Sequence, residues 1–270
     1  MVTDGAAGSD PARGPLEVTG ARVGEVLDGA DLPQAWVPRP FLHPVRTLGG
    51  VVLTDRHPDD HPWHSGLGVA LPDVDGVNCW GGPTFVPGAG YRWRDDHGTA
   101  TVASAASDGP RLRSEIGWHD PGGRLLLHED RTLEWGAAPD GWQLLWTSSF
   151  RAPGDRPVEL GSPGSHGRAG AGYGGWFLRF ARCTDVVVRN ADGAGEDRVH
   201  GSVTPWIAWT GSFDGGRAHV LVEALDHRDA WFVRVTEYPA VGSALAWRSP
   251  VLVRPDEPLV RSFRVTVSDG

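Results

Sequence analysis

RLLLHEDRTLEW, residues 124–135, is the stretch that decides the fold. Strand alternation along it places His128, Asp130, Thr132 and Glu134 on one face, whereas the other face mixes leucines with Glu129 and Arg131. RLRSEIGWHD (111–120) precedes it across the turn residues PGG, and WQLLWTSSFRA (142–152) follows it across the loop GAAPDG. Three such runs joined by short connections predict an antiparallel meander.

Short apolar runs continue to the end of the chain, where PLVRSFRVTV (258–267) places Leu259, Phe263, Val265 and Val267 on one face and Ser262, Arg264 and Thr266 on the other. Glycine (38 residues) and proline (22 residues) interrupt the chain too often for long helices. No repeat and no shift in composition marks a second domain. We therefore predict an all-β fold, a large antiparallel β-sandwich in a single domain over residues 15–270, with less than about a tenth helix. Residues 1–14 are predicted to form a disordered tail.

The composition excludes several classes of chemistry. The chain contains no lysine, so all 25 basic residues are arginine. Lysine Schiff bases, and with them pyridoxal phosphate (PLP) enzymes, are therefore excluded, as is the lysine of a phosphate-binding loop. No glycine-rich dinucleotide fingerprint follows a predicted strand, so no nicotinamide cofactor is expected. A formal net charge of −9 without a basic cluster argues against nucleic acid as a partner.

The apolar runs and the cysteines indicate where the protein resides. A membrane-spanning helix needs about 20 consecutive apolar residues, and every apolar run in this sequence is much shorter. No membrane partner is therefore expected. The first residues lack the apolar segment of a secretory signal. Cys79 and Cys183 are too few for a disulfide framework and are expected to be buried thiols. These features favour a soluble, cytoplasmic protein, and they are compatible with a homo-oligomer.

HPDDHPWHSG, residues 57–66, concentrates histidines in one short segment. Pro62 would break a helix, and a flat strand would put His64 on the face opposite His61. The segment is therefore predicted to be a stiff loop of the kind that often carries function. The alternative interpretation, a proline-rich turn whose histidines only cap strand ends, stays open.

A fourth imidazole, His43, lies nearby in FLHPVRT. Three imidazoles can bind a divalent metal, and two can act as a general acid and base. We predict His43, His61 and His64 as the ligands of a candidate divalent-metal site, although the spacing matches no standard metal motif, and place His57 at its rim. Arg46 is a candidate clamp for a carboxylate or a sugar hydroxyl.

The central strand offers charged residues among its leucines. Alternation places Glu129 and Arg131 on the leucine face and His128 on the opposite face. One interpretation is a neutralised ion pair, and the other is a pair of groups aimed into a cleft beside the core. On the second interpretation Glu129 is a catalytic carboxylate and the other two residues contact the substrate.

Several of the 13 tryptophans lie beside glycine or polar residues, as in VNCWGG (77–82) and GYGGWFLR (172–179). Aromatic faces next to polar groups are typical of sites that hold sugar rings. Trp80 and Trp176 are predicted to line one concavity together with His61. The complete set of predicted substrate-binding residues is Arg46, Trp63, Asn78, Trp80, His128, Arg131, Tyr173 and Trp176.

Four parts of the sequence together resemble the bacterial PmoA-like family. They are PFLHPVRTLGGVVLTDRHPDDHPWHSGLGVA (40–70), NCWGG, GYGGWFLR and the closing run from DAWFVRVTEYP to PDEPLVRSFRVTVSDG, and the most specific is the His-Pro-x-His-x-Gly signature, here HPWHSG. The resemblance implies a bacterial protein of carbohydrate catabolism. The membrane oxygenase activity in the family label is not carried over, because no segment is long enough to span. The short strands and the histidine loop are also similar to galactose mutarotase-like supersandwiches, in which a histidine and a carboxylate act on a sugar ring.

These observations support three functional hypotheses. The first is a carbohydrate-active enzyme of the epimerase, lyase or hydrolase type, with His61, His64 and Glu129 transferring protons and a divalent metal as an optional aid. The second is a noncatalytic sugar-binding or interaction module, in which the same aromatic residues bind and the histidines only shape a loop. The third is an oxidoreductase, as the PmoA-like label suggests, which would need a bound redox metal.

Overall fold

The computed structural model describes residues 13–226 and 228–270. Over these residues the chain forms 21 strands, one short α-helix, α1 (Glu196–Val199), and one 3-10 helix, η1 (Gln34–Trp36). The predicted all-β fold and its low helix content are confirmed. Most of the predicted N-terminal tail, residues 1–12, lies outside the described residues, and the first strand already begins at Gly14.

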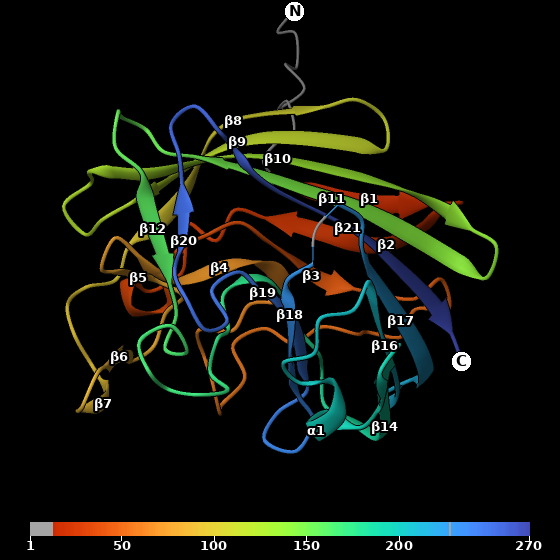
Figure 1. The fold of residues 1–270 in the computed structure, drawn as a ribbon. Coiled ribbons are helices and arrows are strands. Elements are labelled where there is room, and N and C mark those ends of the chain that lie inside the picture. The colour runs from red at the N-terminus through yellow and green to blue at the C-terminus, as the bar shows by residue number, and fades with distance from the viewer. Residues whose placement is uncertain (1–12, 227) are drawn as a thin grey trace, which may run out of the picture.

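Two large antiparallel sheets make up the fold, and Figure 1 shows them stacked on one another. The first is ten-stranded. Its main path runs β1 (Gly14–Val18), β2 (Ala21–Leu27), β3 (Phe41–Val45), β4 (Leu67–Val74), β13 (Gly175–Arg179), β19 (Ala240–Ala244) and β18 (Ala230–Arg234), and β5 (Val77–Cys79), β12 (Val158–Gly161) and β20 (Val251–Val253) pair off this path.

The second sheet is nine-stranded and contains the predicted meander. Its order is β15 (Gly193–Ala194), β14 (Cys183–Asn190), β16 (Trp206–Phe213), β17 (Gly216–Ala224), β21 (Leu259–Asp269), β11 (Gly141–Arg151), β10 (Leu125–Ala138), β9 (Arg111–His119) and β8 (Thr99–Ser107). Leu133 of β10 lies opposite Trp146 of β11 and Leu112 of β9, so one buried row crosses three strands. A small hairpin is formed by β6 (Thr84–Val86) and β7 (Gly90–Arg92). It lies on the side of the ten-stranded sheet that faces away from the nine-stranded sheet, at the lower left of Figure 1.

One hydrophobic core fills the space between the two sheets and includes residues from Leu16 to Val267. Trp118, Trp142 and Trp146 are completely buried in it. Trp176 belongs to the same core: its ring stacks on Phe263 with centroids 5.2 Å apart. The prediction that Trp176 lines the histidine concavity is therefore wrong.

Glu129 and Arg131 also face this core, as the alternation along β10 predicts. The Arg131 guanidinium donates to the Glu129 carboxylate from Nε at 2.7 Å and from a terminal nitrogen at 2.9 Å, and Glu129 also accepts hydrogen bonds from Trp118 and Ser148. The second guanidinium nitrogen of Arg131 donates to the carbonyl of Pro40, which joins the two sheets. Glu129 and Arg131 thus form a neutralised, fully hydrogen-bonded ion pair in the core. The predicted roles of Glu129 in catalysis and of Arg131 in substrate binding are wrong, because neither side chain lines the histidine cavity.

The other face of the ten-stranded sheet carries a second, smaller apolar cluster. Along β13, Trp176 and Leu178 point into the core, whereas Phe177 points out to this cluster. The cluster comprises the buried residues Ala70, Trp80, Phe177, Phe232, Ala240 and Ala244, with Trp63, Tyr173, Tyr238 and Trp247 packed against them. We call it the outer cluster, and it forms the floor of the candidate site.

Candidate functional site

The histidine loop, residues 57–66, is tied at its base and turns twice. Gly66 N–H donates to Asp55 at 2.9 Å and His57 N–H donates to His64 at 3.0 Å, which closes the base of the loop. His61 N–H donates to Pro58, and His64 N–H donates to His61, so two successive turns follow Pro58. Gly66 has φ +52°, and a Cβ there would collide with the carbonyl oxygen of Leu42. Gly66 therefore holds a backbone conformation that other residues resist.

These turns stack the imidazoles of His61 and His64 with centroids 4.7 Å apart and planes 12° apart. His61 Nδ1 lies 2.9 Å from an Asp60 oxygen, and Asp60 accepts two hydrogen bonds from one Arg179 nitrogen at 2.8 and 3.0 Å. The other terminal nitrogen of Arg179 lies 3.3 Å from His64 Nδ1. Arg179 also lies over the ring of Tyr238, 4.8 Å from its centroid. The buried Arg179 therefore positions both histidines: it bonds to Asp60, the partner of His61, and it lies next to His64.

The charges in this network assign the two imidazole tautomers. Burial acts to raise the pKa of Asp60, but the hydrogen bonds from His61 and Arg179 and their charges outweigh it, and the pKa falls below its usual value. An ionised Asp60 accepts the Nδ1 proton of His61, so a neutral His61 carries its lone pair on Nε2. Burial, followed by the neighbours His61, Arg179 and Arg39, lowers the pKa of His64 far below its usual value. Because Arg179 can only donate, His64 accepts at Nδ1 and keeps its proton on Nε2.

Both histidines line a cavity of about 270 Å³, which we call the histidine cavity. The outer cluster supplies its apolar walls, including Trp80, which packs against Tyr173 at a centroid distance of 4.7 Å. Trp63 and Tyr238 contact His61, with centroids 5.2 and 4.5 Å away. The predicted placement of Trp63, Trp80 and Tyr173 beside the two histidines agrees with this geometry.

Three charged residues of the histidine cavity have no counterpart in the sequence prediction. Arg168 donates to the Tyr91 hydroxyl at 3.1 Å and lies over that ring. Arg234 packs over Phe232 and pairs with Glu237, whose carboxylate lies 3.4 Å away and is largely exposed. Glu237 is therefore a carboxylate of the same cavity as His61, the position that the prediction gave to Glu129.

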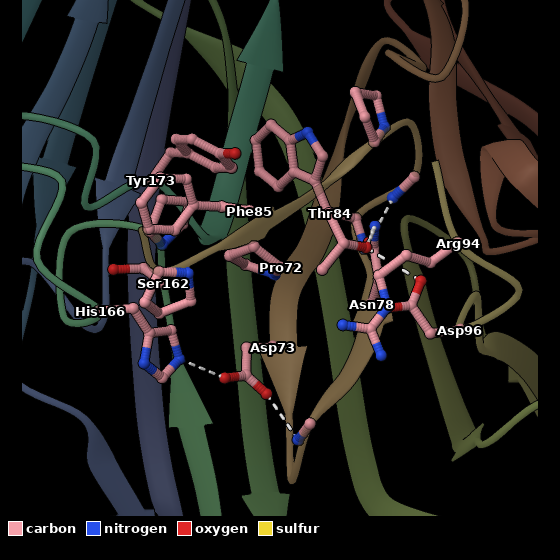
Figure 2. A pocket seen from close by; sticks show the side chains of 16 residues that line it. Pro72, Asp73, Asn78, Thr84, Phe85, Arg94, Asp96, Ser162, His166 and Tyr173 are labelled. Carbon is pink, nitrogen blue, oxygen red and sulfur yellow. Dashed lines mark hydrogen bonds and ion pairs between the residues drawn. The ribbon is translucent and has the colours of Figure 1, made fainter. Parts of the chain in front are cut away.

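A second cavity of about 270 Å³ adjoins the first, and Figure 2 shows its lining. His166 Nε2 and Asp73 form a hydrogen bond of 2.5 Å at one end, where Asp73 also accepts from Gly76 N–H. On another side, Thr84 accepts from Asn78 and donates to Asp96, each at 2.9 Å. We call this space the Asp73 cavity.

Asn78 lines the Asp73 cavity but is used internally. Its amide nitrogen donates to Gly82 and Thr84, and its oxygen accepts from the N–H groups of Trp80 and Gly81. These bonds fix the turn that presents Trp80. The predicted role of Asn78 in substrate binding is thus replaced by a supporting one.

The predicted metal ligands are not brought together. The Thr54 hydroxyl accepts from Val45 N–H and also hydrogen-bonds to His43 Nδ1 at 3.0 Å, while the ring of His57 packs on Trp36. Within the described part of the chain, no three histidine, cysteine, aspartate or glutamate side chains are arranged to hold a metal ion. The predicted trio with His43 is wrong because β3 directs that side chain to Thr54.

Two further predicted contact residues lie elsewhere. His128 is exposed on the outer face of the nine-stranded sheet, because it alternates with the buried Glu129. Arg46 follows β3, where its carbonyl accepts from Trp142 Nε1 and its guanidinium donates to Gly50. Neither residue lines the histidine cavity. Both cysteines are free thiols; Cys79 is buried and Cys183 is partly buried.

Comparison with known proteins gives the family. The chain belongs to a family of unknown function, DUF6807, whose model matches residues 15–270. The PmoA-like label predicted from the sequence gains no support from this family. No curated protein matched the chain. None of the helices described is long and apolar enough to cross a membrane.

Solved structures resemble the chain only distantly. An Escherichia coli K12 protein described as a "putative aldose 1-epimerase" is 12% identical, with 96% of this chain and 99% of that chain covered and a TM-score of 0.41. A protein described as a polysaccharide lyase is 13% identical with a TM-score of 0.38; the match covers 95% of this chain but 32% of the lyase. Such identities and TM-scores carry no inference about activity.

Proposed function

We propose that the protein is a carbohydrate-active enzyme that transfers protons at a sugar ring bound in the histidine cavity. One observation carries the proposal: Asp60 binds Nδ1 of His61 and Arg179 binds Nδ1 of His64, and the two imidazoles are stacked on one another. A sugar can give a proton to the first histidine while one of its oxygens accepts a hydrogen bond from the second.

The walls of the histidine cavity support a sugar as the ligand. Apolar aromatic faces pack on the C–H faces of a sugar ring, and polar groups around them bind its hydroxyls. Trp63, Trp80 and Tyr238 supply the faces, and Arg168 and Glu237 supply the polar groups. Glu237 is also the second proton-transfer group that an epimerase, lyase or hydrolase requires in addition to His61.

The reaction is tested by incubating the protein in D₂O with glucose, galactose, glucuronate, galacturonate and their methyl glycosides, followed by proton NMR. Loss of a C–H signal reports proton abstraction from carbon, exchange between anomer signals reports mutarotation, and a new reducing end reports hydrolysis. We expect one of these changes. Sugar binding without any of them would favour the noncatalytic binding module instead.

The His61→Ala variant separates catalysis from binding. Removal of a general base costs about 100-fold to 10,000-fold in turnover, whereas the aromatic walls and hence the sugar affinity stay nearly intact. The matched control is His128→Ala, an exposed histidine on the other sheet. Full turnover by the His61→Ala variant would contradict the assigned role.

A further inference from the structure

The histidine cavity and the Asp73 cavity are neighbours that share part of their walls. Trp80, Gly81, Pro83 and Tyr173 line both. Each cavity has a volume of about 270 Å³, just below the about 300 Å³ at which pockets for small molecules commonly begin. Two such cavities side by side offer more room than a single sugar ring needs.

The Asp73 cavity repeats the chemistry of a sugar subsite. Figure 2 shows Phe85 and Tyr173 on its wall, with the Asp73–His166 pair below them and Asp96 on another side. The aromatic residues offer apolar faces, while the carboxylates and the imidazole offer acceptors and donors for hydroxyl groups. None of these groups is assigned to proton transfer.

A third aromatic surface lies against Trp63, a wall residue of the histidine cavity. Trp93 follows β7 and is 63% exposed, which is unusual for so large an apolar side chain. Its ring meets the edge of Trp63 at a centroid distance of 5.9 Å. The exposed indole can therefore stack on a sugar that extends beyond Trp63.

We infer that the substrate is an oligosaccharide of at least two sugar units, one held in each cavity, with Trp93 as a platform for a further unit. This inference rests on the proposed function, because it assumes that the histidine cavity holds a sugar. It assigns the Asp73 cavity and Trp93 to recognition of chain length, whereas His61 and Glu237 keep the proton transfer.

Calorimetric titration with sugars of increasing length tests the inference. The probes are glucose and cello-oligosaccharides, galacturonate and oligogalacturonates, and N-acetylglucosamine and chito-oligosaccharides, each from one to four units. For the series that binds, the second unit is expected to raise affinity by about tenfold or more, as one added stacking contact with hydrogen bonds would. Equal affinity for one unit and two units would overturn the inference and leave the proposed function standing. Absence of binding by every sugar would overturn both.

Variants test whether the gain in affinity from each added sugar unit comes from the Asp73 cavity or from Trp93. Phe85→Ala and His166→Gln in the Asp73 cavity should remove most of the gain from one unit to two. Trp93→Ala should remove the gain from the next unit. The control is Trp206→Ala, a partly exposed tryptophan at the start of β16 in the other sheet, which should keep the wild-type ratio of affinities. A ratio unchanged in all three test variants would overturn the inference even if long sugars bind.

Discussion

At the scale of single residues, the candidate site depends on one arginine far away in sequence. Arg179 lies 119 positions after Asp60 and 115 after His64, yet it bonds to both. The local density of histidines was enough to predict that His61 and His64 lie close together. Nothing near the loop indicated that Asp60 orients His61 or that Arg179 lowers the pKa of Asp60, because those effects exist only after folding.

Asp60→Asn tests the orientation of His61. The amide can donate to Nδ1 and so favours the wrong tautomer, with the proton on Nε2. We expect turnover to fall about 100-fold or more, with sugar affinity changed little. Asp59→Asn, an exposed neighbour in the same loop, is the control. Equal turnover of the two variants would show that Asp60 does not orient the base.

Glu129→Ala tests the buried pair on β10. Removal of the carboxylate leaves Arg131 charged and unpaired between the sheets, and breaking a buried pair costs about 3–5 kcal/mol. The control, Glu134→Ala on the same strand, removes a partly exposed ion pair with Arg111, which contributes about 1 kcal/mol or less. Urea unfolding measures both variants. Similar losses of unfolding free energy would contradict the burial argument.

At the scale of elements, alternation predicted strands well wherever one face is wet. β10, β11 and β21 follow the sequence pattern closely. It failed at β13, where all five residues are buried because apolar clusters cover both faces of the sheet. With no polar face to mark direction, Trp176 could not be assigned to the core side from its sequence.

The histidine loop is the element whose backbone can be tested most directly. Gly66 and Gly50 both have positive φ, but only at Gly66 would a Cβ strike another residue. Gly50→Ala should therefore cost only the conformational penalty, about 1–2 kcal/mol. Gly66→Ala should cost more and should also reduce turnover, because it displaces the base of the loop. Thermal unfolding and turnover are measured for both variants. Equal effects of the two substitutions on stability and turnover would show that a Cβ at position 66 does not collide with Leu42.

At the scale of the whole molecule, the two faces of the ten-stranded sheet have separate tasks. The inner face packs against the meander, and the outer face carries the outer cluster and the histidine loop. The sandwich follows from local patterns, so its class was predictable from the sequence. The cavity was predictable only in part, because Arg168 comes from a loop far in sequence from the end of β18, which supplies Arg234 and Glu237.

The fold as a whole also keeps several imidazoles neutral, which predicts its response to acid. Burial, followed by Arg56, His57 and Arg46, lowers the pKa of His43 to about 4, and burial first of all lowers the pKa of His57 and His64 as well. Above about pH 6.5 these groups are neutral in both folded and unfolded chains. As the pH falls further, these histidines bind protons in the unfolded chain but stay neutral in the folded chain. The unfolding free energy therefore decreases.

The expected result is a steady loss of stability between about pH 6.5 and about pH 4, measured by urea unfolding. The lowered pKa of Asp60 adds to the loss only below about pH 4, where an unfolded carboxylate becomes protonated. His43→Gln retains a hydrogen-bond partner for the Thr54 hydroxyl but cannot be protonated. This variant should therefore lose less unfolding free energy than the wild type over this pH range. His219→Gln is the matched control, because His219 also contacts a threonine hydroxyl but is exposed. If both variants lose stability with acid as steeply as the wild type, burial of His43 is not the cause.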